Sequence, residues 1–129
     1  MDQEIIEGAE TLCTIIDNEV EFNGLAYIDK AVVMYVAHGA GPCHDAMNDF
    51  LSTDLVENYF ASEQIRLFYF DCCSDELNDL AKEMDIVQVP TIGVYTYGVE
   101  IGRGIGIVSR HRLVGFVARM YDSVVHFEH

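Results

Sequence analysis

The stretch His38-Gly39-Ala40-Gly41-Pro42-Cys43 follows a wholly apolar run, Ala31 to Ala37, and precedes a helical pattern. We expect the run to be a strand that is covered on both faces, because such strands show no polar alternation. Pro42 suits the first turn of a helix, where its missing N–H would have no intrahelical partner. The stretch therefore predicts a tight strand-to-helix junction, as in α/β proteins.

Hydrophobic periodicity on both sides of this junction predicts the other elements. Before it, apolar residues three and four apart favour a helix over residues 3–20, and Leu25–Ile28 is a candidate short strand. After it we expect, in order, a helix to about residue 60, a strand Ile65–Phe70, a helix capped by Ser74 that ends near Met84, a strand within residues 87–97, a strand Val99–Arg103 and a last helix capped by Ser109. This order predicts one α/β domain over residues 1–129, with a central mixed sheet flanked by helices.

Acidic residues outnumber basic ones by 22 to 7, which gives a net charge of −15. The excess is uneven, because residues 101–129 contain four arginines, Arg103, Arg110, Arg112 and Arg119, and two acids. A surface with this excess of negative charge repels nucleic acids and anionic membranes, and we therefore expect neither as a partner. We interpret the acidic face as a solvated surface, with docking of a basic partner as the alternative.

The N-terminus, Met1-Asp2-Gln3-Glu4, is acidic where a secretory signal would be basic. The longest apolar run, Ala31 to Ala37, is too short to cross a bilayer. We therefore expect a soluble cytoplasmic protein, and we expect it to be a monomer without a cofactor.

Four cysteines, Cys13, Cys43, Cys72 and Cys73, are expected to stay reduced in that compartment. Cys13 is interpreted as a buried hydrophobic residue. Cys72 and Cys73 follow the strand Ile65–Phe70, which would end at the same sheet edge as Ala31–Ala37 if the two are parallel. They are either small residues near a helix start or partners of Cys43 in an unconventional redox pair. His38 and His44 flank the motif, but their spacing matches no standard zinc pattern, so we expect no metal.

Three motifs together resemble the thioredoxin family: Ala40-Gly41-Pro42-Cys43, Val89-Pro90-Thr91 and the later Gly106. Thioredoxins have Cys-Gly-Pro-Cys at the first place, a proline between Ile or Val and Thr at the second, and a glycine before the last helix at the third. The resemblance covers residues 25–122 and implies a thioredoxin-like fold. It also implies a docking surface for a protein or peptide thiol or disulfide partner, made by Gly39, Gly41, Pro42, Val89, Pro90, Thr91 and Gly106.

The resemblance further implies a role for each position. The first motif cysteine attacks disulfides as a thiolate that the helix start stabilises, and the second resolves the mixed disulfide. Cys43 stands at the resolving position and Ala40 at the nucleophile position. Pro90 would follow a cis peptide bond and present the backbone of Val89 to an extended partner, with Thr91 beside it.

Several departures from the family pattern determine the predicted function. A methyl group at Ala40 cannot attack sulfur. The aspartate and lysine that assist proton transfer in thioredoxins are replaced by Met34 and Leu67, and two common tryptophans are replaced by Gly39 and Val36. The sequence therefore predicts a redox-silent or single-thiol binding protein. The alternative is a thiol–disulfide oxidoreductase in which the attacking cysteine has been substituted by alanine.

Overall fold

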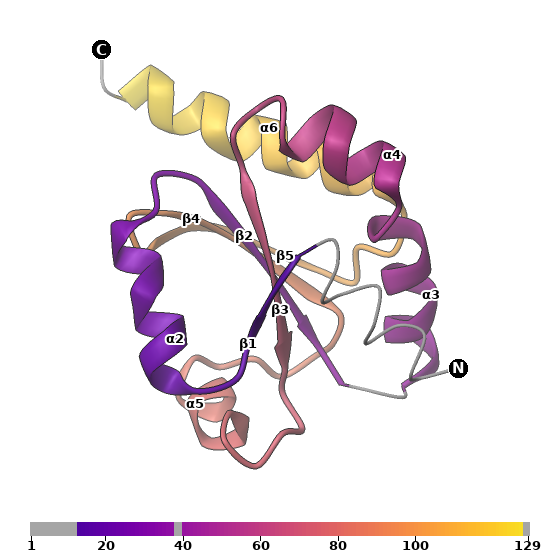
Figure 1. Ribbon diagram of the computed structural model, residues 1–129, viewed down its shortest axis with the longest axis vertical. Coiled ribbons are helices and arrows are strands. Elements are labelled where there is room, and N and C mark those ends of the chain that lie inside the picture. The colour runs from indigo at the N-terminus through magenta and orange to yellow at the C-terminus, as the bar shows by residue number, and fades with distance from the viewer. Residues whose placement is uncertain (1–12, 38–39, 128–129) are drawn as a thin grey trace.

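The computed structural model describes residues 13–37 and 40–127 and contains a five-stranded sheet in the order β1-β3-β2-β4-β5 (Figure 1). The strands are β1 (Thr14–Ile16), β2 (Ala31–Val36), β3 (Arg66–Asp71), β4 (Thr91–Thr96) and β5 (Val99–Ile105). The helical elements are α2 (Glu19–Asn23), η1 (Gly24–Tyr27), α3 (Gly41–Phe50), α4 (Thr53–Leu55), η2 (Val56–Phe60), α5 (Asn78–Glu83) and α6 (Arg110–Phe127).

The two central strands follow from their residue types. Every residue of β2 is buried, and four of the six residues of β3 are. β2 pairs parallel with β3 and antiparallel with β4, while β4 and β5 form an antiparallel hairpin. The predicted mixed sheet is therefore confirmed, and β2 lies at its centre as its unbroken apolar run indicated.

Helices cover both faces of this sheet (Figure 1). On one face, α3 and α6 pack on an apolar cluster that includes Met34, Phe50 and Leu113. On the other, α2, η1 and α5 pack on a second cluster that includes Tyr35, Phe70 and Leu77. The alternation along β2 sends neighbouring side chains into different clusters, because successive residues of a strand point to opposite faces. The expected three-layer α/β architecture is confirmed.

The helix predicted over residues 3–20 is wrong at its C-terminal end. Thr14–Ile16 form the edge strand β1, paired in parallel with Phe68–Phe70, and a helix begins only at Glu19. The β-branched residues of this segment favour a strand, and pairing with β3 outweighs the helical spacing of its apolar residues. Residues 3–12 of the predicted helix lie outside the described residues.

Three other predicted elements differ from those observed. Leu25–Ile28, predicted as a strand, lies mostly in the 3-10 helix η1. The helix predicted to run to residue 60 is interrupted after Phe50, and a new helical turn begins at Thr53, where the Ser52 hydroxyl accepts a hydrogen bond from Leu55 N–H. Ser74 lies in a turn before α5 and does not cap it, because α5 begins at Asn78. In each case, local hydrogen bonds set boundaries that periodicity does not resolve.

The hairpin and the last helix match their predictions. Tyr97 and Gly98 both have positive φ angles, 47° and 78°, as a tight β4–β5 turn requires. The hydroxyl of Ser109 accepts a hydrogen bond from Arg112 N–H at 3.4 Å and caps α6. The Tyr121 hydroxyl of α6 is within hydrogen-bond distance of Ala31 O and Tyr95 O, so the helix is tied to β2 and β4. Among the described residues, no helix combines the length and apolar character needed to span a membrane.

Candidate functional site

The junction between β2 and α3 carries the motif that the sequence singled out. Ala40 is the N-cap residue of α3, with an extended backbone and no side-chain capping bond. Its carbonyl accepts the first helical hydrogen bond, from His44 N–H at 2.9 Å, and its own N–H donates to Ala37 O. Gly41 and Pro42 form the first turn of α3, as predicted. Gly39 and His38 lie outside the described residues.

Cys43 points into the protein. Its side chain is only 2% exposed and packs in the same cluster as Met34 and Ile107. The backbone N–H of Ala37 donates a hydrogen bond to Cys43 Sγ at 3.4 Å. Burial raises the pKa of this thiol, which outweighs the lowering effect of that hydrogen bond. At neutral pH the thiol is therefore protonated and shielded from solvent, and it is a poor nucleophile.

The loop before β4 meets this junction because β4 runs antiparallel to β2. Thr91, the first residue of β4, pairs with Tyr35 near the end of β2. The Val89–Pro90 peptide bond is cis, so this expectation is confirmed. Ala40 and Val89, both partly buried, pack against the cluster that contains Cys43. The structure thus brings the two motifs together at one edge of the sheet.

Hydrogen bonds fix the conformation of the proline loop. The N–H of Gly106, a residue with φ of 75°, donates to Pro90 O at 3.0 Å, so the third motif also lies here. The Thr91 hydroxyl donates to Gln88 O at 2.7 Å, and the Thr91 side chain is only 2% exposed. Thr91 is therefore a buried support of the loop. Among the described residues, neither the N–H nor the C=O of Val89 has a hydrogen-bond partner.

The layer beneath the motif is apolar. Met34 is fully buried and pairs with Tyr69 and Ile92 on the neighbouring strands, and Leu67 is 5% exposed in the same cluster. Neither side chain can accept a proton. The two positions at which thioredoxins would have ionisable groups are thus part of the hydrophobic core.

The remaining cysteines differ in exposure and carry no disulfide. Cys72 N–H donates to Val36 O at 2.8 Å, so the Cys72-Cys73 pair lies at the end of β2 where Cys43 also lies. Cys73 is exposed, whereas Cys72 is half-buried and burial raises its pKa to about 12. Cys13 is also half-buried, and burial raises its pKa to about 12 as well. β2 and β3 are parallel, so the condition under which the two strands end at the same sheet edge is met.

The other polar groups near the motif form no metal site in the described part of the chain, where no cluster of three potential ligands occurs. His44 Nε2 is 3.1 Å from the Asn48 side-chain amide, while its buried Nδ1 has no partner there. One feature of the site carried no sequence signal, the Ala37 N–H that binds Cys43, whereas the resemblance to thioredoxins already implied the open backbone of Val89. The Ala37 N–H is a backbone group, and residue types do not reveal its partner.

Solved structures with high similarity to this chain are thioredoxins from several organisms. Mitochondrial thioredoxin 3 of Saccharomyces cerevisiae, in its oxidized form, is 26% identical with a TM-score of 0.68, and the match covers 84% of this chain and 96% of that one. Spinach chloroplast thioredoxin f is 20% identical with a TM-score of 0.69, covering 84% and 93%. The Malassezia sympodialis thioredoxin is 20% identical with a TM-score of 0.68, covering 84% and 92%.

Sequence comparisons add nothing to these structural matches. No protein-family model matches the chain, and no curated protein sequence matches it either. The identification therefore rests on the sheet order, the helical layers and the extent of the structural matches. Together they establish that the chain is a thioredoxin-like protein with the thioredoxin fold.

Proposed function

We propose that this protein is a redox-silent, thioredoxin-like binding module that docks an extended protein or peptide segment at its proline loop. The observation that carries the proposal is a combination of two facts: Ala40 stands at the start of α3, and Cys43 is only 2% exposed. A disulfide exchange cycle needs an accessible thiolate to attack and a second thiol to resolve. Ala40 offers no sulfur, and Cys43 is protonated and enclosed.

The apolar layer under the motif supports the same proposal. Met34 and Leu67 leave no ionisable group to accept a proton from a motif thiol. A single-thiol reaction at Cys43 would need this side chain to emerge from the core. Its burial therefore favours the redox-silent form of the proposal over the single-thiol form.

The unpaired backbone of Val89 supports a docking role. Its N–H and C=O have no partner among the described residues, and both are the groups by which an added strand pairs with a protein. The bond from Gly106 N–H to Pro90 O holds the loop in position. Such preorganisation lowers the entropic cost of binding an extended segment.

Amide chemical shifts test the docking role. The probe is the carboxymethylated insulin B chain, whose blocked cysteines cannot exchange disulfides. We expect shifts at Val89, Thr91 and Gly106, and weaker binding in Val89→Pro, which removes the N–H donor. Val87→Pro is the matched control, because Val87 lies two residues away and is 80% exposed. An absence of shifts at the proline loop, or equal binding by both variants, would reject docking at Val89.

The alternative is a thiol–disulfide oxidoreductase that has lost only its attacking cysteine. Insulin reduction by dithiothreitol separates it from the binding module, with Ala40→Cys as the test variant. The binding module predicts little activity in Ala40→Cys, because Met34 and Leu67 remain. Strong activity in that variant would favour the oxidoreductase and overturn the proposal.

A further inference from the structure

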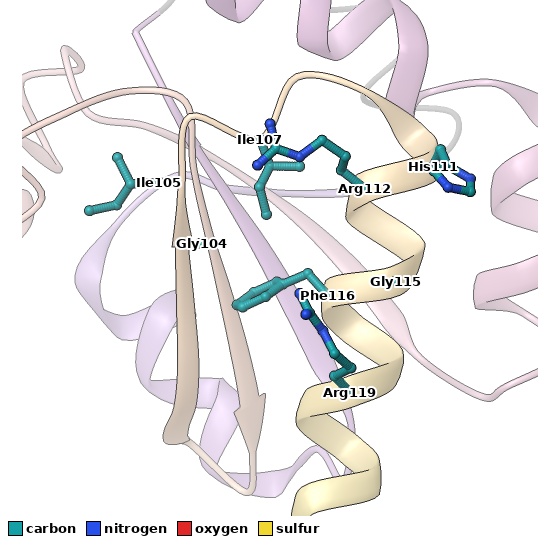
Figure 2. A pocket seen from close by; sticks show the side chains of 8 residues that line it. All are labelled: Gly104, Ile105, Ile107, His111, Arg112, Gly115, Phe116 and Arg119. Atoms are coloured by element: carbon teal, nitrogen blue, oxygen red, sulfur yellow. The ribbon is translucent and has the colours of Figure 1, made fainter.

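A groove of about 390 Å³ runs between β5 and α6, and no cysteine lines it (Figure 2). Its lining residues are Gly104, Ile105, Ile107, His111, Arg112, Gly115, Phe116 and Arg119. The groove therefore combines the positively charged side chains of Arg112 and Arg119 with an apolar floor. In a chain of net charge −15, such a concentration of cationic groups is unusual.

One face of α6 builds the groove. Arg112, Gly115, Phe116 and Arg119 are spaced by three and four residues, so they lie on the same side of the helix. Arg112 and Arg119 extend toward the β5 side, where the Phe116 ring lies between them, whereas His111 points to the other side of α6 (Figure 2). Gly115 has no side chain and leaves the helix surface open at the middle of this stripe.

The glycines of β5 bring the floor close to the helix. A Cβ atom at Gly104 would lie 2.4 Å from Ile107 Cδ1 and 3.2 Å from the Phe116 ring. Phe116 can therefore pack directly on the strand, and it remains half-exposed toward the groove. Ile105, at the end of β5, is 52% exposed and extends the apolar surface.

The two groove arginines lack the partners that the other two arginines of this region have. Arg103 pairs with Glu100 at 2.9 Å, and Arg110 pairs with Asp49 at 3.7 Å. Within residues 13–37 and 40–127, the guanidinium groups of Arg112 and Arg119 have no such carboxylate. Two exposed guanidinium groups without a carboxylate partner in the described part of the chain therefore flank a half-exposed aromatic ring.

From this arrangement we infer that the β5–α6 groove binds an acidic polypeptide segment of a partner protein, with carboxylates on Arg112 and Arg119 and an apolar side chain over Phe116. Guanidinium groups form charge-assisted hydrogen bonds with carboxylates, and the ring accepts an apolar contact. The two arginines are separated by about 10 Å along the helix axis, because seven residues rise about 1.5 Å each. An extended segment with acids four residues apart covers that separation, since it rises about 3.3 Å per residue, and the residue midway between the acids faces the same side.

A second copy of this chain is a poorer occupant, because two molecules of charge −15 repel each other. The inference also stands apart from docking at Val89, because it rests on residues of β5 and α6 and on Ile107 between them, and not on the proline loop. Occupation of the groove without any change at Val89 would therefore support the inference and leave the proposed function to its own test.

Amide chemical shifts during titration with a synthetic peptide that repeats Glu-Ser-Leu-Ser test the inference, because its glutamates and leucines face the same side when it is extended. We expect shifts at Gly104, Gly115 and Phe116, and none with the same peptide carrying glutamine in place of glutamate. Arg112→Gln and Arg119→Gln are each expected to weaken binding about two- to fivefold, and together about tenfold. Gly115→Glu places a carboxylate between the two arginines on an open helix surface and is expected to abolish binding.

Arg66→Gln is the matched control, because Arg66 is an exposed arginine at the start of β3, outside the groove. It is expected to leave binding unchanged. The inference is overturned if the groove amides do not shift, if the glutamine peptide binds equally well, or if Arg66→Gln weakens binding as much as the groove variants. Dimer formation at the groove in sedimentation measurements would also overturn it, by making a second copy the occupant.

Discussion

The pKa of a thiol introduced by Ala40→Cys measures how strongly the start of α3 stabilises a negative charge. Ala40 is the half-exposed N-cap residue, and no acidic residue lies in the first turn of α3. The partial positive charge at a helix N-terminus stabilises an anion by about 0.3 to 2 kcal/mol. Since one pKa unit corresponds to about 1.4 kcal/mol, the thiol of Ala40→Cys should titrate about 0.2 to 1.5 units below the usual value of about 8.5. We expect its pKa to be about 7.5.

The assay is the rate of alkylation by iodoacetamide as a function of pH, with the modified cysteine identified by mass spectrometry. Cys73→Ser is included in the background to remove the exposed thiol. The rate at residue 40 should rise through its pKa while Cys43 stays unmodified, because burial raises the pKa of Cys43 and encloses it. A pKa of 8.5 or higher at residue 40 would refute the reasoning, since the helix start would then provide no stabilisation.

The remaining predictions concern thiols, hydrogen bonds, glycines and pH. In the folded chain a thiol reagent should label Cys73 first and Cys43 only after unfolding; rapid labelling of Cys43 in the native state would contradict its 2% exposure. Tyr121→Phe should lower the free energy of unfolding in urea by about 1 kcal/mol, because the buried carbonyls of Ala31 and Tyr95 lose the hydroxyl that donates to them; an unchanged midpoint would argue against these bonds. Gly98→Ala should destabilise the fold more than Gly106→Ala, although both glycines have positive φ angles. A Cβ at Gly98 would lie 2.9 Å from Ala26 Cα, whereas a Cβ at Gly106 would have no atom within 4 Å. Equal losses of melting temperature would contradict this prediction. Burial raises the pKa of Tyr35 and Tyr95, so the unfolded state loses these protons first and stability should fall above about pH 10; a flat stability profile from pH 9 to 11 would oppose it.

The sequence predicts the centre of this fold well because its central elements are strongly patterned. The apolar run of β2, Pro42 at the start of α3, and the Gly98 turn each require one local structure. The edge strand β1 was missed because three residues carry too little periodicity, and only pairing with β3 decides their conformation. Edge elements depend on partners that are distant in sequence.

The sequence likewise predicts some features of the candidate site and not others. The resemblance to thioredoxins implied the cis bond at Pro90, which is present, and it placed Gly106 at the same surface, where its N–H donates to Pro90 O. The burial of the Cys43 and Thr91 side chains depends on packing from several elements, so residue types alone could not supply it. The groove on α6 had a sequence signal in the spacing of Arg112, Phe116 and Arg119, but its apolar floor depends on how closely β5 approaches the helix.

The most direct test of the central claim is insulin reduction by dithiothreitol in the presence of the unaltered chain, followed by turbidity. We expect insulin to be reduced no faster with the unaltered chain, or with Cys43→Ser, than with dithiothreitol alone. The reason is that no accessible thiolate stands at the start of α3. Acceleration by the unaltered chain that disappears in Cys43→Ser would contradict the account and assign redox activity to the buried thiol.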